Sequence, residues 1–195
     1  MNYLGHSVLS FGDAEILTGN LIADHVKGKI VLDKFPEGIK KGILLHRKID
    51  EYTDNHPATK RAKIFFKPEY GLYAGAILDC LYDHYLANDP VYFSSEKELL
   101  KFSEDTYNKV ETQAAYFPPT FAGYFPYMRQ HNWLYNYRTM PGINKSLNGL
   151  KRRALHMPEI EKAYQIFVVE YYILAQCYYE FMDDMAKFVK VELSL

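Results

Sequence analysis

Three segments of the sequence carry Asp, His or Asn residues spaced four positions apart. These residues are Asn20 and Asp24, then His46, Asp50 and Asp54, and then Asp79 and Asp83, with His84 directly after. Residues four apart lie on one face of an α-helix. If each segment is helical, it therefore presents its metal-type or acid–base groups on one side.

The third set is the hardest to explain as a surface feature. Asp79 and Asp83 lie within the mostly apolar stretch ILDCLYDHYL. Carboxylates that are buried close together repel each other, and they need a cation or a shared proton. An Asp–His pair in an apolar helix therefore indicates a metal site. For the other two segments, a charged outer face of a helix is an alternative interpretation.

A mixed set of imidazole and carboxylate groups suits a divalent cation. Cys80 and Cys177 are far apart, which argues against a structural zinc site and a disulfide framework. A divalent cation lowers the pKa of bound water and polarises a phosphoryl oxygen. Arg47 adjoins His46, and a guanidinium matches the geometry of a phosphate. No G-x-S-x-G, Walker-type or G-x-G-x-x-G motif indicates another chemistry.

Gly, Pro and capping residues divide the chain into the helices that must position these groups. Asp13 caps a helix to about residue 27 that ends at Gly28, and Pro36 precedes one over about 37–54. Further helices are expected over 57–67, before Pro68, over 71–87, and from a capping box at 95–98 to about 115. Prolines 118, 119, 126, 141 and 158 interrupt the chain after that.

The last block, 158–190, is predicted to be the longest helix. Its apolar residues follow steps of four and three: Ile160, Tyr164, Phe167, Tyr171, Leu174, Tyr178, Phe181, Met185 and Phe188. This face is expected to pack into the core, because aromatic residues fit poorly in a coiled-coil dimer, the alternative interpretation. No period-two pattern predicts a sheet. The fold class is therefore all-α, with one helical domain over 1–195.

The bulk composition bounds the class of protein. Hydrophobic residues make up 48% of the 195, enough for a core, and 18 Tyr and 12 Phe are expected to fill that core and its grooves. The net charge of −1 gives no reason to expect nucleic acid as a partner. The first residues lack a signal-peptide pattern, and no stretch is apolar enough for a membrane span. A cytoplasmic protein is expected.

The same segments resemble the acyl carrier protein phosphodiesterase family. The matching stretches are MNYLGH, GNLIADHV, HRKIDEYTD and LDCLYDHYLA, followed by Trp133, Tyr137, Arg138 and LNGLKRR at 147–153. The similarity runs over nearly the whole chain, and the first 90 residues carry its most specific part. His25, where the family has an aromatic residue, and Lys48, where it has Arg, depart from the pattern without touching the Asp and His set.

The resemblance implies an all-α fold like that of the His-Asp metal phosphohydrolases. It also implies hydrolysis of the phosphodiester that joins 4′-phosphopantetheine to a serine of acyl carrier protein. The metal residues it implies are Asp24, His46, Asp79, Asp83 and His84, with His6 and Asp50 as catalytic neighbours. Mn²⁺ is expected, with Mg²⁺ or Fe²⁺ as alternatives. Arg47 and Arg153 would bind the phosphate, and His6 would protonate the leaving serine oxygen.

An acidic carrier protein would meet basic side chains, and the chain has three basic clusters. These are Lys40-Lys41, Lys60-Arg61-Lys63 and Lys151-Arg152-Arg153, each of which also suits an ordinary solvated surface. Two other functions stay open: a metal-dependent phosphohydrolase for a nucleotide or another small phosphate ester, and a non-enzymatic helical protein that binds a carrier arm. The oligomeric state is not predicted.

Overall fold

The computed structural model describes residues 1–27, 32–154 and 156–195. Its α-helices are α1 (Tyr3–Val8), α2 (Ala14–Ile22), α3 (Glu37–Asn55), α4 (Pro57–Tyr70), α5 (Ala74–Ala87), α6 (Glu96–Glu111), α7 (Pro119–Gln130), α8 (Trp133–Asn136), α9 (Met140–Arg153), α10 (Glu161–Val169) and α11 (Tyr171–Leu193). Short 3₁₀ turns span Ala23–His25, Leu32–Lys34, Gly71–Tyr73 and Ala114–Tyr116. No strand occurs in the described residues, so the prediction of an all-α fold is confirmed.

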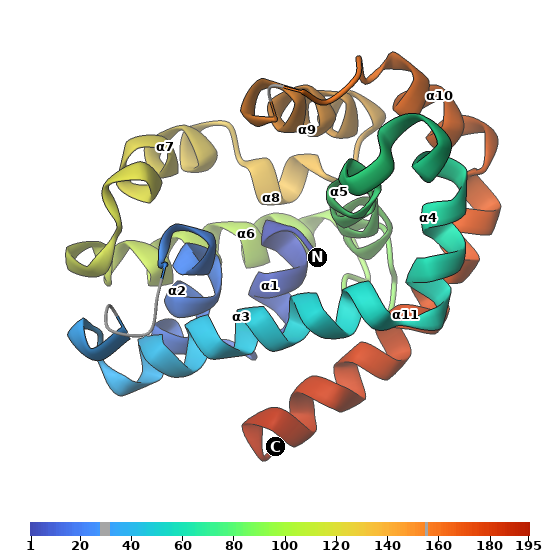
Figure 1. The fold of residues 1–195 in the computed structure, drawn as a ribbon. Helices are drawn as coiled ribbons and strands as arrows, with labels where there is room; N and C mark the ends of the chain where they lie inside the picture. The colour runs from blue at the N-terminus through green and yellow to red at the C-terminus, as the bar shows by residue number, and fades with distance from the viewer. Residues whose placement is uncertain (28–31, 155) are drawn as a thin grey trace.

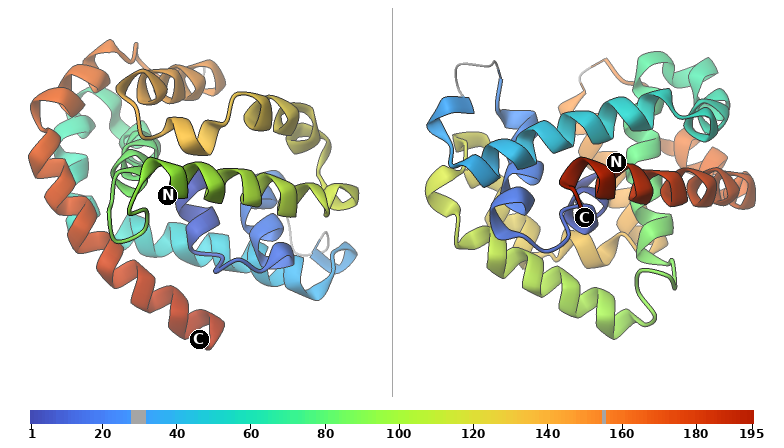
Figure 2. Two further views of the ribbon diagram at one scale, coloured as in Figure 1. Left: turned by 180° about the vertical axis from the view of Figure 1, so that it is seen from behind. Right: turned by 90° about the horizontal axis from the view of Figure 1, so that it is seen from below.

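The short helix α1 lies at the centre of the molecule. In Figure 1, α3 runs along one side of it, and the row formed by α7, α8 and α9 lies on the opposite side. Helix α5 packs against both α1 and α9, and α11 packs against α3 and α4 at the periphery (Figures 1 and 2). One cluster of buried apolar side chains draws on all of these helices, which is consistent with one domain.

Helices α2 and α3 approach each other very closely because each has a glycine at the contact. A Cβ added to Gly19 would lie 2.1 Å from the carbonyl oxygen of Ile39, and one added to Gly42 would lie 2.2 Å from that of Ile16. Real Cβ atoms do not come so near, so larger residues would push the helices apart. This contact brings the polar residues of α2 next to those of α3.

Several predicted helix starts are confirmed. The Asp13 carboxylate accepts from the backbone N–H of Ile16 at 2.8 Å, and α3 begins directly after Pro36. The Ser95 hydroxyl accepts from the N–H of Glu98 at 3.3 Å. The Glu98 carboxylate closes this cap on Ser94, one residue before the position that a capping box predicts.

The predicted helix ends are less accurate. Helix α4 continues through Pro68 to Tyr70, a buried residue whose hydroxyl donates to the backbone of Glu159. Pro126 also lies inside a helix, α7, whose apolar side chains are buried on both sides of it. Burial therefore outweighs the hydrogen bond that each proline removes. Helix α2, predicted to run to about residue 27, ends earlier in a 3₁₀ turn at Ala23–His25, and the predicted end at Gly28 lies outside the described residues. Helix α6, predicted to run to about residue 115, ends at residue 111.

The last predicted helix is two helices, α10 and α11, that meet at Glu170. The predicted apolar face is nevertheless buried on both sides of the break, with Phe167, Leu174, Phe181 and Met185 fully inaccessible. The helix is interrupted at Glu170, but side chains from both α10 and α11 pack against the same hydrophobic core. The interpretation as a core-facing helix is confirmed, and its continuity was wrong.

Candidate functional site

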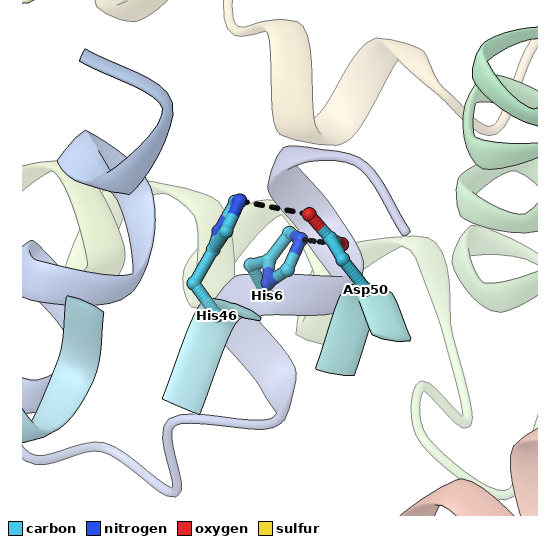
Figure 3. A group of neighbouring side chains, drawn as sticks. All are labelled: His6, His46 and Asp50. Carbon is cyan, nitrogen blue, oxygen red and sulfur yellow. Dashed lines mark ion pairs between the residues drawn. The ribbon is translucent and has the colours of Figure 1, made fainter. Parts of the chain in front are cut away.

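Two imidazoles and one carboxylate meet where α1 passes over α3. His6 Nε2 lies 3.3 Å from Asp50 Oδ1, and His46 Nε2 lies 3.0 Å from Asp50 Oδ2. The two rings stack with their centroids 4.0 Å apart and an angle of 15° between the planes. Figure 3 shows both rings on the same side of Asp50, with one carboxylate oxygen toward each ring. Both imidazoles are buried, whereas the Asp50 side chain is 43% exposed and opens the group to solvent.

Asn20 contacts the Nδ1 atom of both imidazoles, on the side of each ring away from Asp50. Its side-chain oxygen lies 2.7 Å from His6 Nδ1, and its backbone oxygen lies 2.8 Å from His46 Nδ1. The Asn20 amide group is itself fixed, because it donates to the backbone of His6 and to the Ser10 hydroxyl. Since an oxygen can only accept, the Nδ1 atom of each ring carries a proton, and loss of any proton on Nε2 would leave the Nε2 lone pair free for a ligand on the side of Asp50. Metal-binding histidines are commonly oriented in this way.

Two further carboxylates border the same group. Asp24, in the turn after α2, places Oδ1 3.2 Å from His46 Nε2 and is mostly exposed. Asp79, on α5, accepts from the amino group of Met1 at 2.8 Å. Together with the two histidines and Asp50, they line a cavity of about 270 Å³. These five residues, which we call the His-Asp cluster, are brought together from α1, the turn after α2, α3 and α5.

The pKa values of the ionisable groups in the cluster are shifted in different directions. Burial, together with the charge of His46, lowers the pKa of His6 to about 4. Burial also acts against protonation of His46, but Asp24 and Asp50 outweigh it and raise the pKa of His46 to about 9. Burial likewise opposes ionisation of Asp50, yet hydrogen bonds from both imidazoles hold the pKa of Asp50 well below its ordinary value.

This arrangement fits a divalent cation. At neutral pH the carboxylates of Asp24 and Asp50 are ionised, and the proton on His46 partly compensates them, as does the Met1 amino group 3.8 Å from Asp50. A cation would replace that proton and take the two Nε2 lone pairs and the carboxylate oxygens, which are the donor types that divalent transition metals accept. The group of His6, His46 and Asp50 has its ligand atoms within 4.8 Å of one another.

The structure does not bring Asp83 into the cluster. Asp83 is completely buried, with Oδ1 accepting from the N–H groups of Asn2 and Gly5 and Oδ2 accepting from that of Leu4 at 2.7 Å. These are free N–H groups at the start of α1, so the carboxylate caps the helix that carries His6. Burial raises the pKa of Asp83 to about 7. Its expected place as a metal ligand is corrected to that of a structural cap.

His84 is also outside the cluster. Its Nδ1 lies 2.8 Å from the backbone oxygen of Tyr137, and its Nε2 lies 3.0 Å from the hydroxyl of Tyr171. The ring packs edge-on against Tyr85 and Phe167. Successive residues of a helix point about 100° apart, so His84 cannot share the direction of Asp83 or Asp79. Its expected role as a ligand is corrected to a buried link between α5, the end of α8 and α11.

The two predicted phosphate-binding arginines lie in different places. Arg47 is exposed, and its guanidinium donates to the backbone oxygen of Val26 at 3.1 Å, outside the cavity. Arg153, at the end of α9, lines the cavity of the His-Asp cluster. The structure therefore places only Arg153 beside the cluster.

A second, larger cavity adjoins the first. Its volume is about 860 Å³, and Asn2, Tyr3 and Arg153 line both cavities. The remaining lining residues come from α7, α8, α9 and their connections. We call this cavity the arm groove. Sequence patterns did not predict it, because its residues come from several short segments with no common spacing. The holding role of Asn20 was missed as well, although its spacing from Asp24 drew attention to it.

The described residues form an all-α protein in which the His-Asp cluster lines a cavity. A sequence model of the family "Acyl carrier protein phosphodiesterase" matches residues 1–185, and the chain belongs to this family. Membership makes it an enzyme, a phosphoric diester hydrolase, and sets aside the interpretation as a purely binding protein.

Curated relatives agree with this assignment. Proteins named acyl carrier protein phosphodiesterase from Enterobacter sp. (strain 638) and Salmonella agona (strain SL483) are 32% and 30% identical, over 95% of both chains in each case. No solved structure matches the chain. The expected likeness to the His-Asp phosphohydrolase fold therefore stays a prediction. No helix in the described parts of the chain is both long and apolar enough to cross a membrane.

Proposed function

We propose that this chain is a metal-dependent phosphodiesterase that releases 4′-phosphopantetheine from holo acyl carrier protein and leaves the apo carrier. One observation carries the metal dependence: the Nε2 atoms of two buried imidazoles face one carboxylate, and both Nδ1 atoms are fixed by Asn20. The names of the relatives support the carrier protein as the substrate.

His6, His46, Asp24 and Asp50 would hold the cation, with Asp79 at the edge of the site. Two nitrogen ligands favour Mn²⁺ or Fe²⁺ over Mg²⁺, which prefers oxygen. When bound, the cation supplies charge that polarises a phosphoryl oxygen and lowers the pKa of water. This assignment moves His6 and Asp50 from catalytic neighbours to ligands. The low pKa of His6 also makes its imidazole a poor proton donor at neutral pH.

Arg153 would bind the non-bridging oxygens of the phosphodiester. It is the arginine that borders both cavities, so its guanidinium can neutralise charge that builds up on the phosphate. In hydrolysis a water oxygen bonds to phosphorus, the bond from phosphorus to the serine oxygen breaks, and that oxygen takes up a proton.

The acidic carrier would dock along α9. In the other two basic clusters, Lys40 pairs with Asp33 and Glu37, Arg61 pairs with Glu180, and Lys63 pairs with Asp54. On α9, Lys151 pairs with Glu159, but Lys145 and Arg152 line the arm groove beside Arg153. Basic side chains next to the site would steer an acidic partner toward it, with a rate that falls as salt is added.

Mass spectrometry of holo acyl carrier protein, after incubation with the purified chain and Mn²⁺, tests this function. The expected result is conversion to the apo carrier, which stops when the protein is treated with EDTA and resumes when Mn²⁺ is returned. A parallel panel of nucleotides tests the alternative phosphohydrolase. An unchanged holo carrier together with hydrolysis of a nucleotide would contradict the proposal and support the alternative.

A further inference from the structure

The arm groove has the size and position of a substrate site. Its volume of about 860 Å³ lies within the range of small-molecule pockets. Because Asn2, Tyr3 and Arg153 border both cavities, the groove and the His-Asp cluster form one continuous recess. A ligand with its phosphate at Arg153 can therefore extend away from the cluster along the groove.

The residue types that line the arm groove indicate which class of ligand it can bind. Side-chain amides come from Asn2, Asn136, Asn144 and Asn148, and an apolar surface comes from aromatic residues that include Trp133. Side-chain amides hydrogen-bond to amides of a ligand as both donor and acceptor. None of the lining residues is acidic, and the charged ones are basic. The groove therefore suits an uncharged, amide-bearing chain that ends in a phosphate, and it offers no counter-charge to a cation.

The aromatic residues Tyr124 and Trp133 do not form a clamp that could hold a planar base between two rings. The rings of Tyr124 and Trp133 are nearly parallel, at 5°, with centroids 6.1 Å apart, which leaves no room for a third ring between them. The Tyr124 hydroxyl is also fixed, at 2.7 Å from that of Tyr3 and 2.8 Å from His25 Nε2. These side chains form a wall on which aliphatic groups can pack.

We propose that the arm groove binds the pantetheine part of the substrate and that Gly149 sets its free width. This inference rests on the proposed function, because pantetheine is the amide-bearing arm of 4′-phosphopantetheine. Gly149 lies in α9 and lines the groove, and a Cβ added there would meet only Arg152 Nη2, at 3.7 Å. A Cβ at Gly149 therefore has room, and because Gly149 lines the groove, a larger side chain there is expected to fill part of it.

Gly149→Leu is the variant that tests the groove. Leucine favours a helix more than glycine does, so the fold is expected to be kept. Filling the groove should raise the KM for holo acyl carrier protein about tenfold, while the bound Mn²⁺ per chain stays unchanged. Gly123→Leu is the matched control, because Gly123 also lies in a helix, has open space around it and lines neither cavity. This control should keep the normal KM.

Trp133, the single tryptophan of the chain, gives a second measurement that needs no turnover. Titration of the wild type with 4′-phosphopantetheine or with pantetheine should change its fluorescence, and inorganic phosphate should not. The response should be weakened in Gly149→Leu and kept in Gly123→Leu. AMP, as a phosphate with a planar base, should give a smaller response than 4′-phosphopantetheine.

The outcomes separate the groove from the reaction. If the wild type fails to hydrolyse holo carrier but Trp133 responds to 4′-phosphopantetheine in a Gly149-dependent way, the groove assignment stands and the proposed reaction fails. If hydrolysis is normal in Gly149→Leu and Trp133 does not respond, the groove assignment is wrong while the reaction stands. A stronger response to AMP than to 4′-phosphopantetheine would also overturn the groove assignment.

Discussion

Two pairs of neighbouring His and Asp residues, one on α3 and one on α5, lie in opposite kinds of environment. His46 and Asp50 on α3 face a cavity, and the Nε2 atom and carboxylate oxygens there face other ionisable groups. Asp83 and His84 on α5 have all their polar atoms engaged by backbone groups or by the Tyr171 hydroxyl. The difference teaches that His and Asp side chains are candidate ligands where they face other ionisable groups at a cavity, and structural where backbone groups or a hydroxyl engage them.

Among the variants that test this comparison, Asp50→Asn should have the largest effect on metal binding and activity. The variant removes the charge that both imidazoles face, so bound Mn²⁺ should be lost and kcat/KM should fall by about a thousandfold or more. Metal analysis and turnover of holo carrier measure the two effects. Asp54→Asn is the matched control, one turn further along α3, where the carboxylate pairs with Lys63 instead. Retention of Mn²⁺ and activity in Asp50→Asn would remove the cluster from the mechanism.

Arg153 and Arg47 offer a similar comparison for phosphate binding, because Arg153 lines the cavity and Arg47 does not. Arg153→Ala should lower kcat/KM about a hundredfold, because a guanidinium beside the developing charge is lost. Arg47→Ala should change it by less than about threefold, since Arg47 holds only the backbone of Val26. Steady-state kinetics of both variants decides between them. Equal losses would mean that the exposed arginine reaches the substrate after all.

Asn20→Ala tests how the imidazoles are held. The change removes the acceptor of His6 Nδ1 but leaves the backbone oxygen that holds His46. Loss of such an orienting group should weaken Mn²⁺ binding roughly 10–100-fold, less than loss of a ligand. Titration of metal-free protein with Mn²⁺ measures the dissociation constant. Ser10→Ala removes a partner of the Asn20 amide and a hydrogen bond to the His6 backbone oxygen, but no partner of either imidazole, so it should have a smaller effect.

The free energy of unfolding of the metal-free protein, measured as a function of pH, tests whether His46 carries the proton. The pKa of His46 is about 9 in the folded chain and 6.5 ordinarily, so its stabilising contribution is complete below about pH 6.5 and is lost as pH rises to about 9. The expected loss is on the order of 2–3 kcal/mol. Urea unfolding of EDTA-treated protein at pH 6.5 and 9 should show it. His46→Gln should remove this part of the slope, and an unchanged slope would contradict the assignment.

His84→Gln should have the smallest effect on the site. Glutamine keeps one donor and one acceptor among the aromatic partners of His84, so the fold should be retained with a modest loss of stability. Bound Mn²⁺ and kcat should stay within about twofold of the wild type, because the group lies outside the cluster. Loss of Mn²⁺ from a folded His84→Gln protein would restore His84 as a ligand and break the contrast between the two pairs.

Local patterns predicted much of the secondary structure. The cap at Asp13, the start after Pro36 and the cap at Ser95 depend on residues close together in sequence, and each was confirmed. The helix end expected at Pro68 and the continuous helix expected through Glu170 were wrong. In both places, buried side chains on either side decide the backbone path, and a local pattern does not contain that information.

The sequence by itself determined the all-α fold, the family and the short set of residues from which the cluster is drawn. Those features follow from periodicity, capping and motif spacing, which are local along the chain. Only the tertiary structure decided which of these residues meet. Asn20 reaches His6 across 14 positions and His46 across 26, and Asp83 reaches the start of α1 across 79. Whether a His or Asp is free to bind a cation depends on such distant partners, because hydrogen bonds made within the fold use up the same atoms.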